Sequence, residues 1–122
     1  MRKIDTYKVS LLDRTKFFAV KIIHLSSNLP KNPAGFTIAD QLVRAGTSIG
    51  ANFVEAQEAT SRKDFFYKVN YSLKEAKETN YWLELILESE LVPKLEIQPL
   101  LQESGEIVKI LVTIVKKLKM KA

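Results

Sequence analysis

Large apolar residues recur at steps of three and four residues along most of the chain, which is the period of an amphipathic helix. The clearest stripe lies in the second quarter of the sequence and comprises Ile38, Leu42, Ala45, Ile49 and Phe53. Small residues, including Gly46 and Gly50, are interspersed with it. A glycine inside a helix costs about 0.5–1 kcal/mol relative to alanine. We therefore expect these two glycines at a close helix crossing, where a larger side chain would overpack the interface.

Four such stripes are separated by proline, glycine and capping residues. They predict helices near residues 13–29, 37–58, 61–90 and 96–119. Residues 1–12 are expected to be irregular. Asp13 or Thr15 is the predicted N-cap of the first helix, Thr37 that of the second and Ser61 that of the third. No stretch alternates apolar and polar residues for long enough to predict a strand. The sequence predicts a single all-α domain over residues 1–122, an antiparallel up-down-up-down four-helix bundle.

The third predicted helix contains a heptad seam with one polar member, Asn80. An unpaired buried amide is costly, so we expect Asn80 to be partly buried and hydrogen-bonded to another helix. Polar residues also follow a narrow strip of the second helix, beside its apolar stripe. The candidate polar network linking these helices is Arg44, Ser48, Asn52, Glu55 and Asn80. Setting helix register is the favoured role, and a ligand site is the alternative.

The third helix also has aromatic residues outside its seam, and the fourth has a second apolar ridge. Surplus aromatic and apolar surface favours a protein interface. The candidate oligomer-interface residues are Tyr67, Tyr71, Tyr81, Trp82, Val108, Val112 and Val115. The alternative is that these side chains cover the edges of the core and keep their polar tips in water.

The net charge is +5, from 19 Lys and Arg against 14 Asp and Glu, and it is concentrated toward the two ends of the chain. Residues 61–94 are balanced, with six basic and six acidic groups. Basic ends can attract the phosphates of RNA or DNA. The candidate contacts are Arg14, Lys16, Lys21, Lys116, Lys117, Lys119 and Lys121. The alternative is that these residues only keep the protein in solution.

Few residues suited to catalysis are present. The chain has no cysteine and a single histidine, His24, and no Gly-rich phosphate-binding motif. Two carboxylate pairs, Glu55 with Glu58 and Glu75 with Glu78, are interpreted as surface charges matched by Lys or Arg. We therefore expect no metal, no cofactor and no enzymatic activity. No apolar run is long enough to span a bilayer and no signal peptide is evident, so a cytoplasmic protein without membrane contact is expected.

Three segments carry a family resemblance: QLVRAGTSIGANFVEA at residues 41–56, SRKDFFYK at 61–68 and LKEAKETNYWLEL at 73–85. They resemble the bacterial four-helix-bundle proteins of the 23S rRNA intervening-sequence family, once labelled S23 ribosomal proteins. The match covers nearly the whole chain, from about Asp13 to Lys117. Some members are encoded within insertions in 23S rRNA genes, and no ribosomal role follows from the historical label.

The resemblance implies a left-turning bundle that assembles as a ring-shaped homo-oligomer, commonly a pentamer. The family is also similar in fold to the accessory protein of diversity-generating retroelements, a basic pentamer that works with nucleic acid. No catalytic residues are established for the family. We therefore expect a non-catalytic homo-oligomer, a pentamer in the favoured case, that binds structured RNA or other nucleic acid through basic surfaces. The alternative is an oligomeric scaffold for a protein partner.

Overall fold

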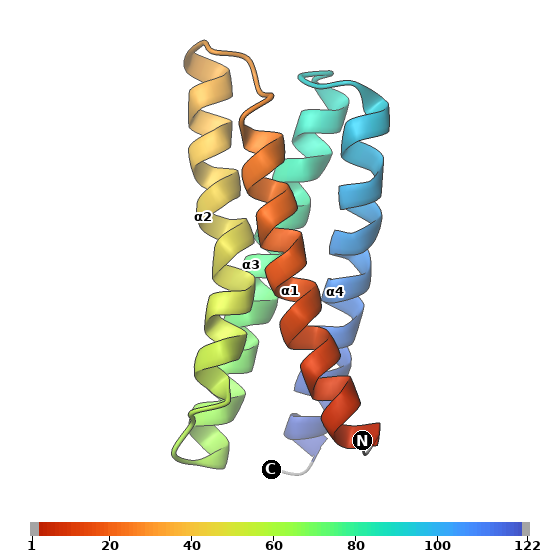
Figure 1. The fold of residues 1–122 in the computed structure, drawn as a ribbon. Helices are drawn as coiled ribbons and strands as arrows, with labels where there is room; N and C mark the ends of the chain where they lie inside the picture. The colour runs from red at the N-terminus through yellow and green to blue at the C-terminus, as the bar shows by residue number, and fades with distance from the viewer. Residues whose placement is uncertain (1–2, 121–122) are drawn as a thin grey trace.

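The computed structural model describes residues 3–120, and it describes side chains from Leu11 to Met120. The helices are α1 (Lys3–Ser26), α2 (Pro33–Ala56), α3 (Arg62–Glu88) and α4 (Lys94–Met120). Residues 3–120 contain no strand, so the predicted all-α fold with four helices is confirmed. Short links at alternate ends of the molecule join successive helices (Figure 1). Each helix contacts two others, whereas α1 and α3 make no contact and lie diagonally across the bundle.

The prediction of irregular structure before residue 13 is wrong for residues 3–12, because α1 already begins at Lys3. Neither Asp13 nor Thr15 caps this helix. The Thr15 hydroxyl donates instead to the carbonyl oxygens of Leu11 and Leu12, at 3.0 and 3.1 Å, as a threonine inside a helix does. Leu11 is buried and extends the apolar stripe of α1 by one step of seven from Phe18. The burial of Leu11 accounts for a helical turn directly before the predicted boundary.

The start of α2 also differs from the prediction, because Asn32 and not Thr37 is the N-cap. The Asn32 side chain accepts a hydrogen bond from the backbone N–H of Gly35 at 2.9 Å, and Pro33 occupies the first helical position. A Cβ atom on Gly35 would lie 1.8 Å from the Pro30 carbonyl oxygen, so only glycine fits here. At α3 the predicted cap is confirmed, since Ser61 accepts from the N–H of Asp64 at 3.0 Å.

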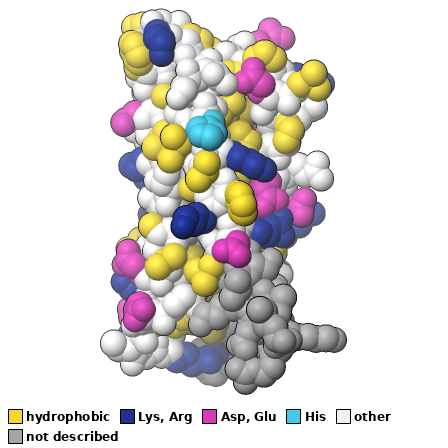
Figure 2. Space-filling model, viewed as in Figure 1, with side chains coloured by type: hydrophobic (Ala, Val, Ile, Leu, Met, Phe, Trp, Pro, Cys, Tyr) yellow, Lys and Arg dark blue, Asp and Glu magenta, His cyan; other side chains and the backbone are white. Residues whose placement is uncertain are grey.

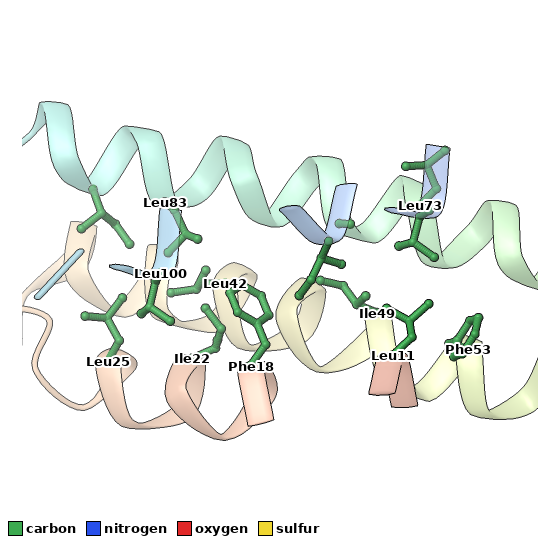
Figure 3. Packing of buried hydrophobic residues seen from close by; sticks show 14 of the residues in the cluster. Leu11, Phe18, Ile22, Leu25, Leu42, Ile49, Phe53, Leu73, Leu83 and Leu100 are labelled. Atoms are coloured by element: carbon green, nitrogen blue, oxygen red, sulfur yellow. The ribbon is translucent and has the colours of Figure 1, made fainter. Parts of the chain in front are cut away.

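The hydrophobic core runs along the axis between the four helices. Figure 3 shows side chains from different helices meeting there, and the labelled ones are Leu11, Phe18, Ile22, Leu25, Leu42, Ile49, Phe53, Leu73, Leu83 and Leu100. All of them except Leu11 lie on apolar stripes predicted from the sequence, whereas Leu11 lies in the stretch that was predicted to be irregular. No side-chain nitrogen or oxygen buried within the described residues lacks a hydrogen-bond partner. The core is therefore apolar, with its few polar groups satisfied.

The predicted close crossing at Gly46 and Gly50 is confirmed, and α1 is the neighbouring helix. A Cβ on Gly46 would lie 2.9 Å from Cγ2 of Ile22, and one on Gly50 would lie 3.0 Å from Oγ1 of Thr15. On the other side of α2, the Ser72 hydroxyl donates to the Ile49 carbonyl oxygen at 2.7 Å. One stretch of α2 thus fixes the positions of both α1 and α3. The small residues let the backbones approach closely, which offsets the cost of glycine in a helix.

Candidate functional site

Arg14 is the first candidate phosphate contact, and the structure places it in an ion pair between α1 and α4. Its Nε donates to Oε2 of Glu103 at 3.0 Å, and its Nη2 donates to Oε1 at 2.6 Å. Glu106 lies 3.2 Å from the same Nη2. The hydrogen bond from Arg14 to Glu103 raises the pKa of the Arg14 guanidinium above its ordinary value. Arg14 therefore ties two helices together, and its guanidinium is already paired with carboxylates, so a phosphate contact by Arg14 stays a prediction.

Arg44 forms a similar tie between α2 and α3. Its guanidinium donates to Glu75 at 3.3 Å and forms a close ion pair with Glu78. The Trp82 indole N–H donates to the same Glu78 carboxylate at 3.0 Å. Lys68 of α3 is paired with Glu55 of α2 at 3.1 Å. The interpretation of these carboxylates as matched surface charges is thus confirmed for Glu55, Glu75 and Glu78.

The polar network predicted along α2 is not continuous. The Ser48 hydroxyl and the Asn52 amide donate to the carbonyl oxygens of Arg44 and Ser48, respectively, so both remain within their own helix. Asn80 lies apart from this strip and faces α4, where its Oδ1 accepts a hydrogen bond from the buried Ser104 hydroxyl at 3.1 Å. The expectation that Asn80 is partly buried and bonded to another helix is confirmed. The helical spacing of the fourth helix puts Ser104 on its seam, but it does not identify Ser104 as the partner of Asn80.

The candidate lysines do not gather in one place. Lys16 and Lys21 are exposed on α1, whereas Lys116, Lys117 and Lys119 lie near the end of α4 and are also exposed. Arg14 pairs with Glu103 and Glu106, so the neighbouring Lys16 lies at about the same height along the bundle as Glu106. Lys116 follows Glu106 by ten residues, so the two groups of lysines are separated by about 15 Å along α4. Lys121 lies outside the described residues. The predicted set is therefore two separate groups.

The group at the end of α4 is enlarged by the start of α3. The Arg62 guanidinium donates to the Leu118 carbonyl oxygen at 3.1 Å, which satisfies a carbonyl in the last turns of α4 and brings the two helix ends together. We call the resulting cluster the basic end, and it comprises Arg62, Lys63, Lys116, Lys117 and Lys119. Lysines here also complement the helix dipole of α4, so they contribute to stability. The sequence analysis missed Arg62 and Lys63 because they lie more than fifty residues from the α4 lysines.

The interface candidates differ widely in exposure. Tyr67, Tyr71 and Tyr81 are each more than half exposed, at 51%, 56% and 57%. Trp82, Val108 and Val112 are only partly buried and pack against the core, which fits the alternative that they cover its edges. Val115 is buried in the core, so its assignment to an interface is wrong.

An exposed apolar surface on α1 was not predicted from the sequence. Phe17, Val20 and Ile23 are 68%, 44% and 45% exposed, and their spacing of three residues puts them on the outer side of α1. We call these three residues the α1 face. Figure 2 shows hydrophobic side chains dispersed among charged ones on the side of the molecule that α1 forms. Phe18 and Ile22, which are interspersed with these residues along α1, are buried in the core.

Neither a cluster of metal-ligand side chains nor a membrane-spanning helix is found in the described part of the chain. Residues 11–120, whose side chains the structure describes, contain no group of three or more His, Asp or Glu side chains placed to hold a metal ion. None of the four helices, over the residues described, is both long and apolar enough to cross a membrane.

The described residues form an all-α fold of four helices. Comparison with known families identifies it further: the family model described as "23S rRNA-intervening sequence protein" matches residues 8–113. The chain belongs to this family, and the resemblance found in the sequence is confirmed. A crystal structure of a protein of unknown function from the S23 ribosomal protein family of Bacteroides thetaiotaomicron VPI-5482 is 42% identical and superposes with a TM-score of 0.81. The match covers 87% of this chain and 98% of that one. No curated protein matches the chain.

Proposed function

We propose that this protein is a non-catalytic homo-oligomer that binds structured RNA or other nucleic acid through its basic surfaces. The observation that carries the proposal is the basic end, where the start of α3 meets the last turns of α4 and the two helix ends present five exposed cationic side chains. Such a surface attracts phosphates because each contact releases counterions from the nucleic acid. Assembly multiplies this effect, and five copies of a +5 chain would carry about +25 in total.

Assembly is supported by the α1 face and by the family resemblance, which implies a ring and most commonly a pentamer. Three apolar side chains on one outer helix surface are removed from water when another copy covers them. Closing a ring requires a second, different surface on the neighbouring copy. The α1 face supplies one of these two surfaces.

Binding is tested by measuring RNA affinity as a function of salt concentration. We expect Lys116→Gln/Lys119→Gln to weaken binding of all sequences alike and to lower the salt slope, because lysines contact phosphates without reading bases. Removing one phosphate contact should reduce the slope by roughly 0.7–0.9. The matched control is Lys31→Gln/Lys94→Gln, which removes two exposed lysines from the opposite end of the bundle. Equal effects of the two variants would assign the binding to net charge and not to the basic end.

A scaffold for a protein partner is the second candidate. The exposed α1 face and the three exposed tyrosines of α3 favour it, since apolar and aromatic side chains predominate at the centres of protein interfaces. Absence of RNA and DNA binding by the unmodified protein at low salt would leave this function in place of the first.

A further inference from the structure

The outer side of α3 carries three exposed tyrosines interleaved with three exposed lysines. We call this surface the tyrosine–lysine face, and it comprises Lys63, Tyr67, Tyr71, Lys74, Lys77 and Tyr81. Tyr67, Lys74 and Tyr81 recur every seven residues and so lie on one line along the helix. With a rise of 1.5 Å per residue, Tyr67 and Tyr81 are about 21 Å apart.

The electrostatic character of this face follows from side-chain pairing, because α3 is nearly neutral by composition. Glu75 and Glu78 turn toward α2, where Arg44 neutralises both. The charge of Lys68 is likewise neutralised, because its ammonium pairs with the carboxylate of Glu55 on α2. The three lysines of the tyrosine–lysine face form no salt bridge with any carboxylate of residues 11–120. Among the carboxylates of residues 63–81, only that of Asp64 has no basic partner, so the tyrosine–lysine face has a net positive charge.

The lysines and tyrosines are also close enough to act together. The Lys63 ammonium lies 5.9 Å from the centre of the Tyr67 ring, and the Lys74 ammonium lies 6.0 Å from the centre of the Tyr71 ring. Exposed aromatic rings can stack on unpaired bases, and neighbouring cations can contact the phosphates of the same strand. A duplex keeps its bases stacked on each other, so it can use only the cations.

We propose that the tyrosine–lysine face binds single-stranded nucleic acid by stacking its tyrosines on unpaired bases. This inference rests on the proposed nucleic-acid function and adds to it a site and a ligand class. The face is continuous with the basic end, because Lys63 belongs to both. It lies diagonally across the bundle from α1, so an assembly in which copies meet at the α1 face does not by itself cover it.

The protein contains its own reporter for this site. Trp82 is the only tryptophan, and its ring meets that of Tyr81 edge-on with 5.2 Å between ring centres. Titration with a short oligouridylate should therefore change the tryptophan fluorescence. A duplex RNA of equal length at the same salt concentration should bind more weakly and change the fluorescence less.

The variant that tests stacking is Tyr67→Leu/Tyr71→Leu, with Tyr67→Phe/Tyr71→Phe as the matched control. The leucine variant should bind oligouridylate at least tenfold more weakly, since stacking on one aromatic ring is worth on the order of five- to a hundredfold in affinity. The phenylalanine variant should bind within about threefold of the unmodified protein, because the ring is retained. The salt slope should stay unchanged in both variants, since the lysines remain.

Four results would overturn the inference. Equal affinity for the oligouridylate and the duplex would show that the face does not select unpaired bases, and so would unchanged binding by the leucine variant. In either case the proposed function would stand, because nucleic acid is still bound. Dissociation of the oligomer in the leucine variant, detected by light scattering, together with unchanged binding per chain would make the face an interface between copies. Failure of the unmodified protein to bind any nucleic acid at low salt would remove the proposed function as well.

Discussion

Arg14 on α1 and Glu103 on α4 form a two-pronged ion pair, with N–O distances of 3.0 and 2.6 Å. The two helices are neighbours in the bundle, and this ion pair is a polar tie between them. Two parallel hydrogen bonds fix the direction of both side chains, which a single contact does not. The pair also explains why a basic residue predicted to contact phosphate is already occupied.

Arg14→Gln should lower the free energy of unfolding by roughly 1 kcal/mol, because both charge-assisted bonds are removed from a partly exposed site. Denaturant unfolding followed by circular dichroism measures this change. Lys21→Gln is the control, since Lys21 is exposed on the same helix and should change stability by less than about 0.5 kcal/mol. Because the Arg14 guanidinium is occupied, its removal should leave the salt slope of RNA binding unchanged. A lower salt slope in the Arg14→Gln variant would show that Arg14 does contact phosphate.

An alanine substitution should have opposite effects on stability at Gly46, which lies at a helix crossing, and at Gly105, which does not. Gly46→Ala should destabilise the protein by on the order of 1 kcal/mol, because overpacking against the buried Ile22 exceeds the gain in helix propensity. Gly105→Ala on α4 should stabilise it by up to about 1 kcal/mol, since a Cβ there meets nothing within 4 Å. Thermal melts of the two variants give the sign directly. Changes of the same sign at both positions would contradict a close contact at Gly46.

The hydrogen bond between Ser104 and Asn80 predicts that alanine substitutions at the two residues lower the free energy of unfolding by different amounts. Asn80→Ala should cost roughly 1–3 kcal/mol, because it leaves the Ser104 hydroxyl, only 1% exposed, without its partner. Ser104→Ala should cost less, since the half-buried Asn80 amide can turn to water. A double-mutant cycle measured by chemical denaturation should give a coupling of about 0.5–1.5 kcal/mol. Zero coupling would mean that the bond adds nothing to stability.

The α1 face predicts the effect of a charge on assembly. Val20→Glu should dissociate the oligomer, or raise its dissociation constant at least tenfold, because burying an unpaired carboxylate at an interface is costly. Light scattering at micromolar concentration measures the mass. Phe36→Glu on α2 is the control, since Phe36 is equally apolar and 61% exposed but lies off the α1 face. An intact oligomer in the Val20 variant would place the interface elsewhere, and a monomeric unmodified protein would refute assembly altogether.

The sequence by itself determined the fold class, the four helices and most of the core. Helical spacing identifies buried positions such as Leu42, Ile49 and Leu83, because burial on one helix face depends mainly on local periodicity. The same reasoning predicted the Gly46 crossing and the polar role of Asn80. It failed at the start of α1 and at the cap of α2, where one more buried turn and a local hydrogen bond to Asn32 decide the boundary.

Only the tertiary structure decided which charges are available. Composition treats Arg14, Arg44 and Lys68 as free cations, but each is paired with a carboxylate on another helix, between 13 and 92 residues away in sequence. The tertiary structure also joins Arg62 to the end of α4, and it leaves the tyrosine–lysine face cationic on a helix of balanced charge. Such pairings depend on which helices are neighbours and at what height their residues meet. Helical periodicity gives the face of each residue but not its partner across the bundle, so the charge pattern of the surface required the packed structure.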